Sequence, residues 1–191
     1  MKKRTNWDFK DYVHTVTIYK SDYGKEVRID EFREPGTMCG YIRFINDVFG
    51  MSVYGDFGNW IFNRQFVPSK NGAVSDDYWI GKLMHSSHQK AYRYDATETR
   101  KRLEEGIKYQ LEDDGYEGDE LDIMKEYYND LFLYVDNPIE YECHSYDLLP
   151  RCGDVDHIPY EKELDYQIQI VFDAFDEMCK RLKNNVIYCL E

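Results

Sequence analysis

The apolar residues change their spacing near residue 67, and this change constrains the fold more than any other feature of the sequence. Before it, short segments alternate between apolar and polar residues and are separated by turn signals such as "EPGT" at 34–37. Such alternation is typical of half-buried β-strands. After it, apolar residues recur every three or four positions, which is typical of amphipathic helices. The sequence therefore predicts an α+β fold, in which an N-terminal antiparallel β-sheet is followed by an acidic helical region.

The sheet region is expected to span residues 1–74 and the helical region residues 75–191, together in one compact domain. Five segments are predicted to form the strands: 12–19, 26–32, 40–47, 48–56 and 59–66. The last of these is rich in aromatic residues, and a helix remains an alternative there because short apolar runs fit both structures.

Two helices have recognisable start signals. Ser75 is followed by two acids and is the candidate N-cap of a helix over residues 75–87. Asp95 has a glutamate three positions later, the spacing of a capping box, and is expected to start a second helix over residues 95–114.

A third helix is expected to begin near Asp119, after two glycines break the second. Residues 136–159 contain three prolines and a glycine and are predicted to form a connector. The last helix is the clearest element, because apolar residues recur at helical spacing from Leu164 to Leu182.

Negative charge gathers in the second half of the sequence. The net charge is −13; residues 1–110 hold 18 Lys/Arg against 15 Asp/Glu, whereas residues 111–191 hold 6 against 22. The segment "LEDDGYEGDELD" at 111–122 carries seven carboxylates and no cation. Such a region repels phosphates, so direct nucleic-acid binding is not expected and a basic partner is favoured. An ordinary solvated acidic surface remains the alternative.

We expect the acidic side chains of the helical region to form one negative patch that binds the partner. The centre of this patch is predicted to contain Asp113, Asp114, Glu117, Asp119, Glu120 and Asp122, and its extension Glu161, Asp165, Asp173 and Asp176. Trp60 and Arg64 are candidates for a secondary contact from the sheet.

Metal-binding motifs are weak in this sequence. A calcium loop with Gly118 at its sixth position places a methionine at the twelfth, where an EF-hand needs a carboxylate. Cys143, His144, Cys152 and His157 carry the side chains that bind zinc, but their spacing fits no standard finger. A zinc site is therefore kept as an alternative, and no metal is assigned.

Catalytic motifs lack the context that their chemistry requires. "GDFGN" at 55–59 contains the letters of a kinase magnesium motif, but no phosphate-binding loop accompanies it, and a tight turn is expected there. "HSSHQK" at 85–90 has no nucleophile-elbow pattern. The protein is therefore predicted to be no enzyme and to use no cofactor.

The remaining composition bears on location. The sequence has no run of about 18 apolar residues, and its start lacks the apolar stretch of a signal peptide. Its five scattered cysteines are expected to be reduced thiols. Together these features predict a cytoplasmic protein that does not contact a membrane.

The stretches "MSVYGDFGNWIFNRQFVPS" (51–69) and "VSDDYWIGKLMHSSHQKAYRYD" (74–95) resemble a segment of small proteins of uncharacterised activity that bacteriophages and prophages encode. The resemblance extends over about residues 10–105. Its most specific residues are Gly55, Asp56, Gly58, Trp60, Phe62, Ser75, Tyr78 and Trp79. It implies a phage or mobile-element setting and supplies no catalytic residues.

In such a setting, small acidic proteins often inhibit host nucleases, including the effectors of CRISPR systems, as mimics of DNA. By that analogy we expect an inhibitor that binds a basic nucleic-acid-handling host protein, such as a CRISPR effector nuclease, in the host cytoplasm. A zinc-stabilised domain or small metal-dependent enzyme is one alternative. A phage structural or assembly accessory is another, and a homodimer is left open.

Overall fold

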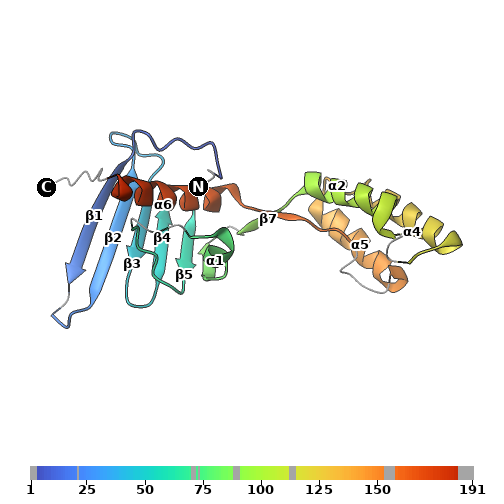
Figure 1. The fold of residues 1–191 in the computed structure, drawn as a ribbon, viewed down its shortest axis with the longest axis horizontal. Helices are drawn as coiled ribbons and strands as arrows, with labels where there is room; N and C mark the ends of the chain where they lie inside the picture. Colours follow the sequence, from blue (N-terminus) through green and yellow to red (C-terminus); the bar gives the residue numbers. More distant parts are fainter. Residues whose placement is uncertain are drawn as a thin grey trace. The chain divides into compact units, whose positions relative to one another are not determined.

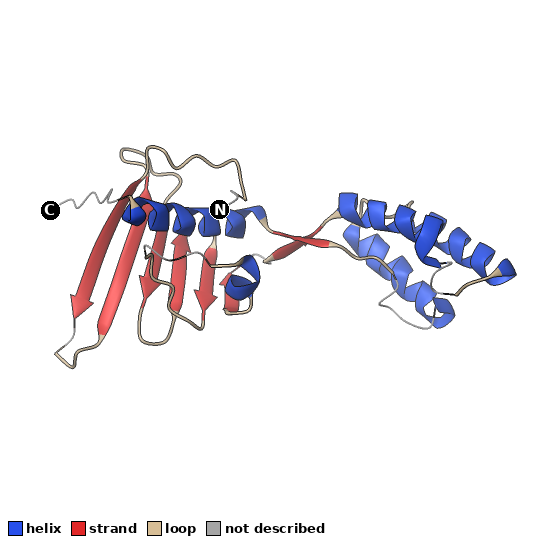
Figure 2. Cartoon of the chain, viewed as in Figure 1, coloured by secondary structure: helices blue, strands red, loops and turns tan. Residues whose placement is uncertain are grey.

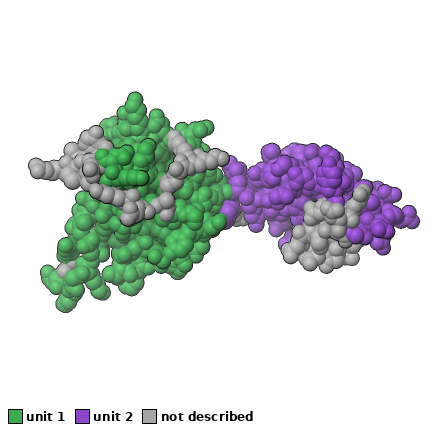
Figure 3. Space-filling model, in the orientation of Figure 1, with its two compact units in different colours: residues 1–91, 164–191 green, residues 92–163 purple. Residues whose placement is uncertain are grey.

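The computed structural model describes residues 4–20, 22–69, 72, 74–87, 91–111, 115–152 and 158–184, with the backbone alone for residues 87, 110 and 147–152. Its contacts divide the chain into two compact units (Figure 3). Unit 1 consists of Met1–Ala91 and Leu164–Glu191, and unit 2 of Tyr92–Glu163. Unit 2 is thus inserted in the sequence between the sheet and the final helix. This division differs from the expected boundary between residues 74 and 75, because the final helix packs with the sheet.

Unit 1 contains a six-stranded antiparallel sheet in which strands adjacent in sequence are adjacent in space (Figure 2). The strands are β1 (Val13–Lys20), β2 (Glu26–Arg33), β3 (Ile42–Asn46), β4 (Met51–Gly55), β5 (Asn59–Phe62) and β6 (Leu83–Ser87). The predicted α+β class and the N-terminal antiparallel sheet are confirmed. Within the segment predicted as a strand over 59–66, residues 59–62 form the short strand β5, and no part of the segment is helical.

The helix expected over residues 75–87 is much shorter in the structure. Ser75 does cap α1 (Asp76–Ile80), because its hydroxyl accepts a hydrogen bond from the Tyr78 N–H at 3.4 Å. The helix ends at Gly81, and residues 83–87 form β6, which pairs with β5. The prediction of helix beyond residue 80 is wrong because the free edge of β5 offers the backbone a ladder of hydrogen bonds.

The turn expected at "GDFGN" is confirmed between β4 and β5. Gly55 has a φ of +143°, and a Cβ placed there would lie 2.0 Å from the Tyr41 carbonyl oxygen. The Asp56 side chain completes the turn by accepting a hydrogen bond from the Tyr41 N–H at 2.9 Å. Both residues therefore have structural roles here.

The final helix is confirmed as α6 (Tyr166–Lys183), which covers one face of the sheet (Figure 1). Its apolar side chains from Ile168 to Cys179 are buried and form the core of unit 1 with the inner side chains of the strands. At the centre of this core, the Trp79 ring stacks on Phe66 at a centroid distance of 4.0 Å and on Phe172 at 5.0 Å. These contacts explain why α1 and α6 pack together although their sequences lie far apart.

Unit 2 is helical. It contains α2 (Ala96–Glu105), the π-helical turn η1 (Gly106–Gln110), α4 (Gly118–Leu131) and α5 (Pro138–Cys152). Asp95 caps α2 as predicted, since its carboxylate accepts a hydrogen bond from the Glu98 N–H at 2.9 Å. The short strands β7 (Tyr92–Tyr94) and β8 (Lys162–Leu164) pair with each other, so both ends of the insertion meet. The core of this unit is separate and contains Leu103, Leu111, Met124, Tyr128, Leu131, Val135, Tyr141 and Ile158.

The connector predicted over residues 136–159 is largely helical, and that prediction is wrong. α5 begins at Pro138, a position where proline is favourable because the first helical N–H needs no partner within the helix. Asn137 accepts hydrogen bonds from the N–H groups of Ile139 and Glu140 at 3.2 and 3.4 Å. None of the helices in the described ranges is long and apolar enough to cross a membrane.

Candidate protein-binding surface

The two units differ sharply in charge. By sequence, unit 2 holds 21 Asp/Glu against 8 Lys/Arg, whereas unit 1 holds 16 of each. The entire net charge of −13 therefore belongs to the inserted helical unit. Unit 1, which contains the sheet and the helix that covers it, has no net charge. The charge difference between residues 1–110 and 111–191 indicated this only in part, because α6 of unit 1 lies in the acidic half of the sequence.

Acidic side chains gather on the solvent-facing side of α4. Met124, Tyr128 and Leu131 bury the inner side of this helix in the core of unit 2. The exposed acids on and just before the helix are Glu117, Asp119, Glu120, Asp122, Glu126 and Asp130, and we call this set the α4 acidic face. Ile123 and Leu133, which are 47% and 76% exposed, lie in the same stretch of chain.

Local helix stability explains only part of the α4 acidic face. Asp119 and Glu120 lie in the first turn, where negative charge interacts favourably with the helix dipole. Asp122, Glu126 and Asp130 follow at intervals of four residues, so like charges are neighbours on the helix surface. Each such pair costs about 0.2–0.5 kcal/mol. These later acids therefore do not stabilise α4 through one another.

Four of the predicted partner-binding residues lie together on this face: Glu117, Asp119, Glu120 and Asp122. Asp113 and Asp114 lie outside the described residues. Glu126 and Asp130 were not among the predicted residues, although they follow Asp122 in the sequence at successive intervals of four, which places them on the same helix face.

Basic side chains of unit 2 pair with acids around α2 and the two short strands. Arg100 lies 3.0 Å from Asp136, and Arg93 lies 2.7 Å from Glu163. Glu161, predicted to extend the patch, is half-buried and lies 3.7 Å from the Arg102 guanidinium. Its backbone N–H donates to the Thr99 hydroxyl at 3.0 Å. Glu161 therefore belongs to this partly neutralised region.

The other three predicted extensions, Asp165, Asp173 and Asp176, lie in unit 1. Asp165 is the N-cap of α6 and accepts a hydrogen bond from the Gln167 N–H at 2.9 Å. Asp173 and Asp176 are only 5% and 8% exposed, and the prediction that they face a partner is wrong. They are buried because the N-terminal segment lies against α6.

Arg4 is the partner of these buried carboxylates. Its guanidinium lies 2.6 Å from Asp76, 2.6 Å from Asp176 and 3.3 Å from Asp173. Burial would lower the pKa of Arg4, but hydrogen bonds to Asp76 and Asp176 outweigh it and raise that pKa. Burial raises the pKa of Asp176, although Arg4 opposes the shift. The cluster joins three segments of unit 1, and of its three carboxylates only Asp76 has a substantially exposed side chain, at 39%.

The two candidates for a secondary contact from the sheet differ in exposure. Trp60 is fully buried, and its ring N–H donates to the Phe57 carbonyl at 2.8 Å, so it cannot contact a partner. Arg64 is exposed and lies over the Tyr78 ring at 5.3 Å from the ring centroid. Of the two, only Arg64 remains available at the surface.

The groups considered for catalysis or metal binding do not converge in the described part of the chain. No cluster of three metal-ligating side chains occurs there. Cys143 is exposed, His144 stacks on Tyr134, and the Cys152 side chain and His157 lie outside the described residues. Burial raises the pKa of the Cys179 thiol to about 11, so this thiol is protonated and unreactive at neutral pH.

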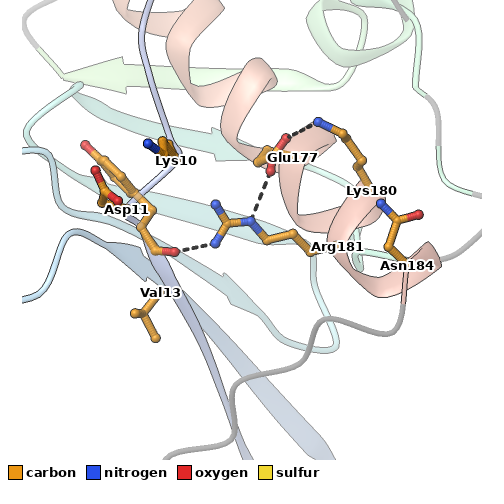
Figure 4. Close-up of a pocket in the computed structure, with 8 residues that line it drawn as sticks. Lys10, Asp11, Val13, Glu177, Lys180, Arg181 and Asn184 are labelled. Atoms are coloured by element: carbon orange, nitrogen blue, oxygen red, sulfur yellow. Dashed lines mark hydrogen bonds and ion pairs between the residues drawn. The ribbon is translucent and has the colours of Figure 1, made fainter.

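A cavity of about 470 Å³ lies between residues 10–13 and the C-terminal end of α6 (Figure 4). Arg181 points into it, but its donors are engaged by the carbonyl oxygens of Phe9 and Tyr12 and by Glu177 at 3.0 Å. Lys180 donates to the same glutamate at 3.2 Å. The charged lining thus fastens the N-terminal segment to α6, and we assign the cavity no ligand.

Comparisons with known proteins give no further indication of function. No protein family, no curated protein and no solved structure matches the chain.

Proposed function

We propose that the protein is a non-enzymatic binding protein whose unit 2 engages a basic surface on a nucleic-acid-handling protein. The single observation that carries this proposal is the segregation of charge: the inserted unit holds the whole net charge of −13, and the sheet unit is neutral. Long-range attraction from such a unit speeds the capture of a basic partner and selects against acidic ones.

The density of charge on α4 supports a mimic of DNA. Five exposed carboxylates fall between residues 119 and 130, a helix length of about 17 Å. This gives one carboxylate per roughly 3–4 Å, close to the ~3.4 Å per charge along one DNA strand. Lys125 is the one cation in the sequence of α4, and it reduces the net negative charge of the helix by one. The charge of this face therefore suits a basic groove that normally accommodates a nucleic-acid strand.

Our proposal for the identity of the partner rests on the expected resemblance to phage and prophage proteins together with this charge. We propose that the partner is a host nuclease, with a CRISPR effector as the leading candidate, and that binding in the host cytoplasm inhibits it. The inhibitor contacts the nuclease and not the nucleic acid, because phosphates are repelled by the same surface.

A pull-down from host lysate at low and high salt, followed by mass spectrometry, identifies the partner. We expect a basic nucleic-acid-handling protein that elutes as salt rises, because exposed charge pairs are screened. Neutralising four residues of the α4 acidic face, in the variant E117Q/D119N/E120Q/D122N, should weaken binding to that purified protein by at least about tenfold.

A matched control removes the same number of charges from exposed positions in unit 1, in the variant D11N/D22N/E26Q/D77N. This control should bind as tightly as the unmodified protein. Equal losses in both variants would show a response to net charge alone, and unchanged binding in the α4 variant would refute the role of this face.

A further inference from the structure

Strand β1 is one of the two edges of the sheet (Figure 1). In the described part of the chain it pairs with β2 along its inner side and with no strand along its outer side. An edge strand presents unpaired N–H and C=O groups that can pair with another strand, and natural sheets usually blunt such edges. The usual devices are short length, charge, proline or a bulge.

The two edges of this sheet differ in these devices. β6, at the far edge, has five residues, and its pairing with β5 is interrupted by a register shift. β1 has eight residues in unbroken register with β2, from Val13 opposite Arg33 to Lys20 opposite Glu26. Its sequence "VHTVTIYK" contains no proline or glycine, and its lysine stands at the very end. Among the described residues, β1 is therefore the less protected of the two edges.

The C-terminal half of β1 also carries exposed apolar side chains. His14, near its start, is buried, but Val16 and Ile18 on the same side of the strand are 38% and 46% exposed. Tyr19 is 60% exposed on the opposite side. Residues of this kind on an exposed edge are characteristic of strand pairing between chains.

The edge is complementary to itself. In an antiparallel pair of two β1 strands related by a two-fold axis, residues of the same parity stand opposite each other. With Val16 on the axis, Thr15 faces Thr17 of the second copy. With Thr17 on the axis, Val16 faces Ile18. Pairs of threonines and of β-branched residues are favourable across strands. Residues 13–19 include no acid and no lysine, so no like charges of these kinds face each other within this segment.

We propose that β1 pairs antiparallel with β1 of a second copy of this chain, so that the two six-stranded sheets become continuous. Unit 1 is neutral, and the acidic charge that would oppose association lies in the other unit. Contact along one strand buries little area, so the dimer is reversible and depends on concentration. Because backbone hydrogen bonds and apolar pairs form it, salt does not weaken it as it weakens binding through unit 2.

Sedimentation velocity of the full-length protein over a concentration series tests the proposal. We expect a monomer–dimer equilibrium that persists at high salt. The variant V16K/I18K places lysines opposite each other whether Val16 or Thr17 lies on the axis, and like charges directly opposite destabilise a strand pair. It should raise the dimer dissociation constant by at least about tenfold.

The matched control is V48K/I61K, which introduces the same changes at exposed positions away from β1. Val48 is 50% exposed in the β3–β4 turn, and Ile61 is 38% exposed on β5. The control should dimerise like the unmodified protein. A wild-type protein that stays monomeric, or a dimer that both variants or neither variant dissociates, would overturn the proposal.

Hydrogen exchange provides a readout that needs no variant. Amides of β1 that point away from β2 should become protected as protein concentration rises. Protection that is already complete in dilute protein would mean that the chain itself covers this edge, and it would also overturn the proposal.

Discussion

The guanidinium of Arg4 lies 2.6 Å from Oδ2 of Asp176, although the two residues are 172 positions apart in the sequence. This contact, with the neighbouring Asp173, holds the N-terminal segment on α6 and removes two carboxylates from the protein surface. It also fixes the charge pattern of the molecule, because the acids of α6 are compensated inside unit 1 and those of α4 are displayed on unit 2.

Replacing Asp173 with asparagine should lower the free energy of unfolding by about 1–3 kcal/mol. The carboxylate accepts hydrogen bonds from the N–H and hydroxyl of Thr5, both at 2.8 Å, and from the Arg4 N–H at 3.0 Å. An amide cannot accept on both sides, so a buried donor loses its partner. Urea unfolding measures the loss.

The control for this change is Asp176→Asn. Oδ1 of Asp176 has no hydrogen-bond partner among the described groups, and a single carbonyl oxygen can still accept from Arg4. Burial already disfavours the charge of Asp176. We expect a smaller loss than for Asp173→Asn, and equal losses would contradict the assigned roles.

Asp30 should stabilise unit 1 in a pH-dependent manner. It is fully buried, accepts two hydrogen bonds from Arg28 at 2.8 Å and lies 2.8 Å from His14 Nε2. Burial would raise the pKa of Asp30, but the hydrogen bonds from Arg28 and His14 outweigh it and lower that pKa below 3.8. Its stabilising contribution is therefore complete above the ordinary pKa and is lost as pH falls through the lowered one.

Asp30→Asn should accordingly cost about 2–4 kcal/mol at neutral pH, and the difference from the unmodified protein should shrink below about pH 4. Unfolding in urea across this pH range measures it. Glu31→Gln is the control, because its pair with Arg43 is partly exposed and contributes little. A difference for Asp30→Asn that is constant with pH would contradict the linkage.

Gly106→Ala should destabilise the protein, although alanine usually favours a helix by about 1 kcal/mol over glycine. Gly106 begins η1 in a helical conformation, and a Cβ there would lie 2.7 Å from the Tyr128 ring of α4. Overpacking of this kind costs about 1–3 kcal/mol. The double variant with Tyr128→Leu should recover part of the loss, and additive losses in this cycle would exclude direct contact as the cause.

Glu126→Gln should separate stability from binding. Glu126 stands four residues from both Asp122 and Asp130, so removing its charge should raise the free energy of unfolding by about 0.4–1 kcal/mol. The same change should slow association with a basic partner, because fewer charges attract it. Thermal unfolding and stopped-flow binding measure the two effects. A variant that gains stability with unaltered association would indicate an ordinary solvated surface.

Local patterns in the sequence predicted the elements whose stability depends on neighbouring residues. Short segments of alternating or aromatic residues between turn signals predicted β1 to β5, and apolar residues at helical spacing predicted α6. Both patterns arise because each element buries one face. Ser75 and Asp95 were identified as caps for a similarly local reason, since their side chains bond to the backbone three positions later. The sequence also placed three acids of the candidate site, Asp119, Glu120 and Asp122, on one helix, with Glu117 just before it.

Contacts between distant residues decided the rest. β6 became a strand because β5 left an edge open, and α5 became a helix that packs Tyr141 into the core of unit 2. The α6 acids were assigned to the surface because sequence spacing cannot show that Arg4 returns to neutralise Asp173 and Asp176. By itself the sequence determined the amount of negative charge and its bias toward the second half. Only the tertiary structure decided which carboxylates are displayed, because burial depends on which distant segment packs against them.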